Sequence, residues 1–423
     1  MALMGMTISE KILATASGKE SVSAGEIIWA EPRTILAHDI SGVGASLYIK
    51  EHFGDVKVKY PDRIVLVEDH YVPCRNKDAA NNLNILEQFA ADNGISRYHR
   101  WGLETNYGVC HVLLPYEGYI LPGTLVIGGD SHTCTHGAMG ALATGCGEID
   151  IGNAMITGDL WFRVPETKQF VLEGTPDDVT MAKDVILHII GTVGSSGSIY
   201  KTAEFTGSYV TDLNIDERLT LSNMAVEMGA KSGLIATDQK TIDFVKARTC
   251  EPFDVVRNDE NAVIERHLFD LDDLGPIVAT PYSPENAVPV EDVEGTSIDQ
   301  AVICACTGAK YTDLKAAAEL LEGKTVKVRT VVLPATQGIY RQALTEGLLE
   351  IFATANVTVG PPTCGPCLGG NMGVLGDGKV CISTSNRNFV GRMGSKTSMT
   401  YLASPRTVAA SAVKGYIYDP RRI

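Results

Sequence analysis

Two groups of cysteines follow apolar runs of the chain. Cys306 comes directly after QAVICA (300–305), and Cys364 and Cys367 lie in PPTCGPCLGG, directly after VTVG (357–360). In open α/β sheets, ligands gather in loops beyond the carboxyl ends of strands. The glycine and proline between the paired cysteines favour a tight turn that lets two thiolates converge. Three thiolates are one fewer than a 4Fe–4S cluster normally takes, so one iron would stay open and act as a Lewis acid.

A C-x-x-C pair also has other interpretations. It is typical of buried core cysteines, of zinc sites and of thioredoxin-like redox pairs. The pair does not follow the first strand of a small βαβ domain, which weakens the redox interpretation, and a count of three disfavours an electron-transfer iron–sulfur protein. Ten cysteines in 423 residues do not indicate a disulfide scaffold.

A second set of residues combines imidazoles with carboxylates, although the chain has only nine histidines. A carboxylate beside an imidazole orients the ring and raises its basicity, which suits proton transfer to and from a hydroxyl. Each histidine, taken alone, could equally be a hydrogen-bonded core residue. The set follows RIVLVE (63–68), lies in YGVCHVLLP (107–115) or follows TLVIGG (124–129), and comprises Asp69, His70, His111, Asp130, Ser131 and His132.

A third set lies in STSNRNFVGR (383–392), where Arg387 and Arg392 are five residues apart among small polar residues. Guanidinium groups grip carboxylates with two parallel hydrogen bonds, so this loop could hold an acidic substrate. The alternative is that both arginines form surface salt bridges.

Short apolar runs alternate with helical patterns along the chain, which predicts an α/β fold with parallel sheets covered by helices. Thr7 and Glu10 form a capping-box pattern, and Gly18 should end the first helix. The other expected helices are 78–94, 312–323 and 336–356, with a helical small-residue segment after GDSHT; the expected strands are 63–69, 124–129, 300–305 and 326–333.

Changes in composition divide the chain into three expected domains, 1–165, 166–285 and 286–423. The first boundary lies near WFRVPETKQFVLEG, where a glycine-rich pattern gives way to a more charged one. The second lies in ATPYSPENAVPVEDVEGTS, a proline-rich and acidic segment typical of a linker.

The formal net charge of −15 argues against nucleic acid or an anionic membrane as the main partner. The N-terminal segment does not resemble a signal peptide, and no run approaches the roughly 20 apolar residues of a membrane span. We therefore expect a cytoplasmic protein.

The segments GDSHTCTHGAMGALATG, PPTCGPCLGG and STSNRNFVGRMG resemble the signature segments of the aconitase superfamily. They are most similar to the branch that holds archaeal-type isopropylmalate dehydratases, homoaconitases and dimethylmalate or citramalate dehydratases. The resemblance covers nearly the whole chain. It implies three α/β/α domains of the aconitase type around a central iron–sulfur cleft, without the swivelling fourth domain.

The resemblance also implies roles for individual residues. It assigns one 4Fe–4S cluster with an open iron to Cys306, Cys364 and Cys367. LSNMAVEMGA (221–230) resembles the family's N-M-x-x-E-x-G-A stretch, which residue chemistry alone would not single out. The implied catalytic residues are Asp69, His70, His111, Asp130, His132 and Glu227, and the implied substrate-binding residues are Ser131, Asn223, Asn386, Arg387 and Arg392.

The implied activity is that of the large subunit of a hydro-lyase that reversibly dehydrates and isomerises a 2-hydroxy di- or tricarboxylic acid. Isopropylmalate, and hence leucine biosynthesis, is the favoured substrate; citramalate, 2,3-dimethylmalate and homoaconitate are the alternatives. The expected partner is a small subunit that carries the swivelling domain, in a heterodimer or heterotetramer. A nucleic-acid-binding function, known for some relatives that lose the cluster, conflicts with the acidic charge.

Four positions depart from the family pattern. The family usually has S-C-T-N around the first ligand, whereas this chain has Ala305 and Gly308 in place of the serine and asparagine. The change is expected to weaken hydrogen bonding around the cluster. Cys304 could compete for iron, and His38 replaces an amide near the first active-site loop.

Overall fold

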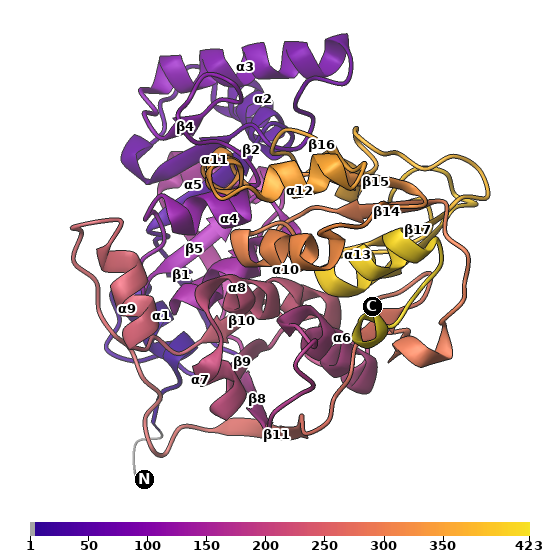
Figure 1. Ribbon diagram of the computed structural model, residues 1–423. Coiled ribbons are helices and arrows are strands. Elements are labelled where there is room, and N and C mark those ends of the chain that lie inside the picture. The colour runs from indigo at the N-terminus through magenta and orange to yellow at the C-terminus, as the bar shows by residue number, and fades with distance from the viewer. Residues whose placement is uncertain (1–4) are drawn as a thin grey trace.

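The computed structural model describes residues 5–423, so the first four residues of the N-terminal segment lie outside the described part. Three sheets with helices packed on them make up most of the chain, and Figure 1 shows them as successive indigo, magenta and orange-to-yellow regions. Most strand pairs are parallel, which confirms the predicted α/β class. None of the helices in residues 5–423 has the length and apolar character that a bilayer crossing needs.

The first sheet has five parallel strands in the order β4-β3-β2-β5-β6. Its strands are β2 (Thr34–His38), β3 (Ile64–Val67), β4 (Tyr98–His99), β5 (Leu125–Gly128) and β6 (Leu142–Gly145). The accompanying helices are α1 (Ile8–Ser17), α2 (Ser41–Phe53), α3 (Lys77–Asn93), α4 (Cys110–Tyr116), the 3-10 helix η2 (Ser131–Met139) and α5 (Glu148–Thr157). A separate antiparallel pair joins β1 (Ile27–Ala30) to β7 (Leu160–Arg163).

The second sheet has four parallel strands in the order β10-β9-β8-β11. They are β8 (Thr167–Glu173), β9 (Thr202–Thr206), β10 (Ser232–Ile235) and β11 (Ile264–Asp270). The helical segments are α6 (Ala182–Val193), α7 (Ser208–Asp212), α8 (Ile215–Asn223), η3 (Met224–Met228) and α9 (Gln239–Lys246). Helix α8 packs against η2 and α10, and so joins this sheet to both of the others.

The third sheet has seven strands in the order β13-β12-β18-β17-β14-β15-β16. They are β12 (Ile277–Ala279), β13 (Ala287–Pro289), β14 (Gln300–Ile303), β15 (Arg329–Val332), β16 (Thr358–Val359), β17 (Val380–Ser383) and β18 (Met399–Leu402). Helices α10 (Tyr311–Leu321), α11 (Gln337–Thr345), α12 (Leu348–Thr354), α13 (Pro405–Lys414) and the 3-10 helix η5 (Gly365–Leu368) accompany it. Strand β12 lies within 166–285 yet pairs with β18; the three domain boundaries stay predictions.

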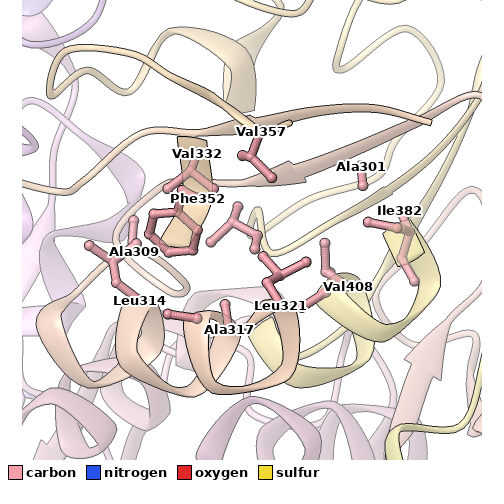
Figure 2. Close-up of a cluster of buried hydrophobic side chains, with 14 of the residues drawn as sticks. Ala301, Ala309, Leu314, Ala317, Leu321, Val332, Phe352, Val357, Ile382 and Val408 are labelled. Carbon is pink, nitrogen blue, oxygen red and sulfur yellow. The ribbon is translucent and has the colours of Figure 1, made fainter. Parts of the chain in front are cut away.

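An apolar core fixes the third sheet to its helices. Leu314, Ala317 and Leu321 of α10 face Phe352 of α12 and Val332 of β15, and all five are buried (Figure 2). Burying side chains of this size contributes roughly 1.5–3 kcal/mol each. The core holds the end of β14, and therefore the Cys306 loop, in a fixed place.

At the helix ends, some of the sequence-based predictions agree with the structure and one does not. The Thr7–Glu10 capping box is present, and Gly18 and Gly94 end α1 and α3 in left-handed conformation, as predicted. The single helix predicted over 336–356 is wrong. Two helices, α11 and α12, replace it because Gly347 has φ +81°, which breaks the helical hydrogen bonding.

Candidate active site

Loops from the first and third sheets meet beyond the carboxyl ends of their strands. The carbonyl oxygen of Asp69, after β3, accepts hydrogen bonds from Cys364 N at 2.7 Å and Thr363 Oγ1 at 2.9 Å. Asp69 Oδ2 also accepts from Cys110 N at 2.7 Å. These contacts bring the histidine and carboxylate residues of one sheet beside the cysteines of another.

Asp130 is the centre of the imidazole group. Its carboxylate lies 2.7 Å from Nε2 of His111 and 3.4 Å from Nε2 of His70, and it accepts from the backbone N of His132 at 2.7 Å. Burial alone would favour the neutral acid, but the charge and hydrogen bond of His111 and the bonds from the other two histidines hold the pKa of Asp130 well below its usual range. The carboxylate therefore stays ionised.

His70 is held between two carboxylates. Its Nδ1 lies 2.6 Å from Oδ1 of Asp69, and its Nε2 faces Asp130. Burial opposes the charged ring, yet the two carboxylates outweigh burial and raise the pKa of His70 well above its ordinary value. The ring is therefore an imidazolium at neutral pH, with a proton directed at the Asp130 side of the site.

His38 packs its ring on His70, with centroids 3.9 Å apart. Its Nε2 lies 3.1 Å from the carbonyl oxygen of Gly129, and its Nδ1 accepts from the backbone N of Ile40 at 3.2 Å. These contacts require a neutral ring protonated at Nε2. Burial and the charge of His70 agree with that state, since they lower the pKa of His38 to about 4. The departure at position 38 thus places a neutral ring against a charged one.

Asp39 fixes the loop that carries this pair. Its carboxylate accepts from the backbone N atoms of Asp69 at 3.1 Å, His70 at 2.8 Å and Tyr71 at 2.8 Å. Within residues 5–423, the ligand atoms of His38, Asp39, Asp69 and His70 are the set of at least three that lies within 4.8 Å of one another. Protein hydrogen bonds already engage these groups, so they do not indicate a metal site.

Glu227 joins the imidazole group to the arginine loop. Its Oε1 lies 2.9 Å from Nε2 of His132 and accepts from Nε of Arg387 at 2.7 Å. Nη1 of Arg387 donates to Ser131 Oγ at 3.0 Å. Although burial favours the neutral acid, His132 and Arg387 together hold the pKa of Glu227 below its ordinary value. Glu227, predicted from the family's N-M-x-x-E-x-G-A pattern, therefore lies among the other predicted site residues.

Two of the three cysteines, Cys306 and Cys367, contact one side-chain amide. Asn386 Nδ2 lies 3.4 Å from Cys306 Sγ, and Asn386 Oδ1 lies 3.5 Å from Cys367 Sγ. Asn223 Nδ2 donates to Cys306 Sγ at 3.0 Å. The thiol of Cys364 hydrogen-bonds Cys367, which lowers the pKa of Cys367 well below its ordinary value, whereas burial raises that of Cys306 to about 11. In this arrangement both amides contact the Cys306 thiol, although substrate binding was the predicted role.

Arg392 borders the cysteines with an unused donor. Its Nη2 lies 3.9 Å from Cys367 Sγ, and its buried Nε has no hydrogen-bond partner among the described residues. A buried guanidinium with a free N–H can receive a carboxylate. The five predicted substrate-binding residues therefore lie beside the six predicted catalytic ones, and their roles stay predictions.

The departure at Gly308 has a steric explanation. A Cβ on Gly308 would lie 2.1 Å from Cβ of Thr384, so no other residue fits there without a shift of the chain. Thr384 Oγ1 donates to the carbonyl of Cys304 and accepts from its N, both at 2.9 Å. Thr384 therefore supplies hydrogen bonds to this loop from the space beside Gly308. Ala305 has φ +68°, a strained conformation for a residue other than glycine.

Two buried lysines behind the cysteine loop were missed by the sequence analysis. Lys310 Nζ donates to the carbonyl of Cys306 at 3.2 Å, and Lys183 Nζ donates to Thr307 Oγ1 at 3.2 Å. The available signal was weak: each lysine stands at the start of a helix with an apolar face, where a solvated side chain is the usual expectation.

The fold and this constellation place three cysteines beside a group of imidazoles, carboxylates and arginines on parallel α/β sheets. Residues 10–415 match the family described as "Aconitase family (aconitate hydratase)", and the chain belongs to that family. Similarity over the full length of the chain points to particular members of that family. The chain is 46% identical over 421 residues to "3-isopropylmalate dehydratase large subunit 1" of Methanopyrus kandleri, covering 99% of each chain.

Two further relatives are also named as large subunits of 3-isopropylmalate dehydratase. The corresponding large subunit 1 of Pyrococcus furiosus is 47% identical over 429 residues, covering 99% of each chain, and the large subunit of Heliobacterium modesticaldum is 46% identical over 424 residues, covering 99% and 100%. The solved structure of Thermococcus kodakaraensis aconitase X (holo-form) superposes with a TM-score of 0.50 at 13% identity, covering 86% and 85%. That structural likeness supports the fold alone. The predicted membership of the aconitase superfamily is confirmed.

Proposed function

We propose that this chain is the large subunit of a 3-isopropylmalate dehydratase, which removes water from a 2-hydroxy dicarboxylate and adds it back at the neighbouring carbon. The full-length identity of about 46% to proteins of that name carries the proposal. The site adds chemical support, because an ionised Asp130, a protonated His70 and a free Arg392 donor lie beside three thiols. The proposal extends to a role in leucine biosynthesis and to a cytoplasmic location.

The cysteine site fits a cluster better than a single ion. A tetrahedral zinc bound at about 2.3 Å brings its sulfur ligands within about 4 Å of one another. Among the described residues, the three cysteines do not form a set whose ligand atoms all lie within 4.8 Å. We therefore assign one 4Fe–4S cluster to Cys306, Cys364 and Cys367. When bound with one iron free of thiolate, such a group supplies a Lewis acid for a substrate hydroxyl and carboxylate.

The protein's own residues supply binding and proton transfer. Arg392 offers its free Nε to a substrate carboxylate. The guanidinium group of Arg387 lies between Glu227 and Ser131 and donates a hydrogen bond to each. The imidazolium of His70, oriented by Asp69, gives a proton to the departing hydroxyl. Asp130 stays ionised and stabilises the protonated ring.

A small subunit completes the proposed enzyme. The curated relatives are named large subunits, which implies a smaller partner. We propose that this partner carries the swivelling domain with the serine that takes the proton from the adjacent carbon, in a heterodimer or heterotetramer. Closing the site excludes water and places that base within hydrogen-bond reach.

Anaerobic reconstitution tests the proposal. The chain is loaded with iron and sulfide and assayed for unsaturated product with and without its small subunit. Isopropylmalate, citramalate, 2,3-dimethylmalate and homoaconitate are compared by kcat/KM, with the Cys306→Ser chain as the control. We expect turnover only in the mixture and the highest kcat/KM with isopropylmalate. A higher value with another acid would reassign the substrate, and full turnover by the isolated chain would refute the need for a partner.

A further inference from the structure

Lys183 is a buried cation held by neutral groups. It stands in the first turn of α6, and its residue is 2% exposed. Its Nζ donates to the carbonyl oxygens of Ser385 at 2.7 Å and Thr384 at 3.3 Å, and to Thr307 Oγ1 at 3.2 Å. These three residues belong to the loops that carry Cys306 and Asn386, so the ammonium lies directly behind the cysteine site.

No carboxylate in residues 5–423 lies within ion-pair distance of this ammonium. The adjacent Asp184 is engaged elsewhere, because its carboxylate accepts from Met181 N at 2.9 Å and Ile277 N at 3.0 Å. Lys310, the other lysine behind the loop, differs, since it pairs with Asp313 at 2.6 Å. A buried charge without a partner is unfavourable by several kcal/mol, so such a lysine is expected to have a counter-charge.

Once ionised to hold a cluster, Cys306 and Cys367 would supply that counter-charge. Burial lowers the pKa of Lys183 to about 8, and the sulfurs of Cys367 and Cys306 act most strongly against that fall. A group held by three thiolates carries net negative charge, and the charge becomes more negative on one-electron reduction. The hydrogen bonds from Lys183 hold its ammonium where it meets that charge.

We infer that Lys183 is the fixed counter-charge of the cysteine-bound cluster, a positioning residue that stabilises the cluster's negative charge and raises its reduction potential. The inference rests on the proposed function, because it requires the cluster. One unit charge acting through an effective dielectric constant of about 20 changes the reduction equilibrium by an order of magnitude, about tenfold. For a one-electron couple, that change corresponds to about 59 mV.

A redox titration of reconstituted variants tests the inference. Lys183→Met removes the charge while keeping most of the side-chain volume, and Lys183→Arg keeps the charge. Lys168→Met is the matched control, because Lys168 is also largely buried but donates to the Gly197 carbonyl and lies near Glu265. We expect a midpoint potential about 59 mV more negative in Lys183→Met and near wild type in the other two variants. An unchanged potential in Lys183→Met overturns the inference.

The cluster-free chain gives a second readout. Cluster loading gives Lys183 its counter-charge, so Lys183→Met should shrink the gain in thermal midpoint on loading, whereas Lys183→Arg should keep it. A merely structural lysine would lower the midpoint equally in both states and leave that gain unchanged, which would overturn the inference. If Lys183→Met fails to assemble the cluster, iron content restored in Lys183→Arg supports charge compensation, and loss in both variants refutes it.

Wild-type iron content separates the two proposals. If the wild-type chain assembles no cluster, the proposed function fails. If it assembles a cluster whose potential is insensitive to Lys183→Met, only this inference fails.

Discussion

Replacing Arg387 by lysine separates the charge of this side chain from its planar fork. The arginine joins two loops, since Nε donates to Glu227 at 2.7 Å and Nη1 donates to Ser131 at 3.0 Å. A lysine ammonium is a single point donor on a flexible stem. It can keep one of the two contacts, but it cannot hold both with the same geometry.

The loss can be estimated from the contacts. The Glu227 side chain is 2% exposed, so a weakened bond to its carboxylate is not replaced by water. Losing one charge-assisted hydrogen bond costs about 1.5–3 kcal/mol. That free energy corresponds to a fall of about ten- to a hundred-fold in kcat/KM. The cluster absorbance should not change, because Arg387 has no hydrogen bond to the cysteines among the described residues.

Steady-state kinetics of the reconstituted two-subunit enzyme measure the effect. Arg406→Lys is the control, since Arg406 lies on α13 and donates to the Asp178 carbonyl at 2.7 Å. We expect the control to keep wild-type kcat/KM. Wild-type kcat/KM in Arg387→Lys would show that the fork has no part in substrate turnover and would refute the reasoning.

Three further outcomes are expected. Cys306→Ser should abolish the iron content and absorbance of the reconstituted chain whereas Cys381→Ser should not; a cluster that survives the first change would contradict the ligand assignment. Gly308→Ala should lower the free energy of unfolding by about 1–3 kcal/mol in chemical denaturation, because its Cβ would lie 2.1 Å from Thr384 Cβ; an unchanged value would show that the loop relaxes freely. Burial lowers the folded-state pKa of His70, but the neighbouring carboxylates of Asp69 and Asp130 outweigh burial and raise it. The stabilisation that His70 contributes is therefore fully present below about pH 6.5 and is lost as the pH rises through the folded-state pKa. The thermal midpoint of the cluster-free chain should fall over that range, and a slope identical in His70→Gln would refute this source.

Local sequence signals predicted features that depend on a few neighbouring residues. The capping box at Thr7 and the left-handed glycines Gly18 and Gly94 are properties of single turns, and these helix ends were predicted correctly. The helix over 336–356 was predicted wrongly because an apolar periodicity continues across Gly347, where only the backbone conformation changes. The sequence singled out most candidate site residues because they follow a strand or stand within one short motif, whereas Asn223 and Glu227 came from the family resemblance alone; the roles of all of them stay predictions.

The sequence by itself determined which chemical groups exist and which loops carry them. Tertiary structure decided which groups meet. Asp130 acquires its low pKa from His111, and Lys183 reaches Thr307 across 124 positions of the chain. Turns and helix caps depend on interactions over three or four residues, so a short stretch of sequence is enough to predict them. Charge, burial and distance between remote side chains depend on sheet order and helix packing, which no local pattern specifies.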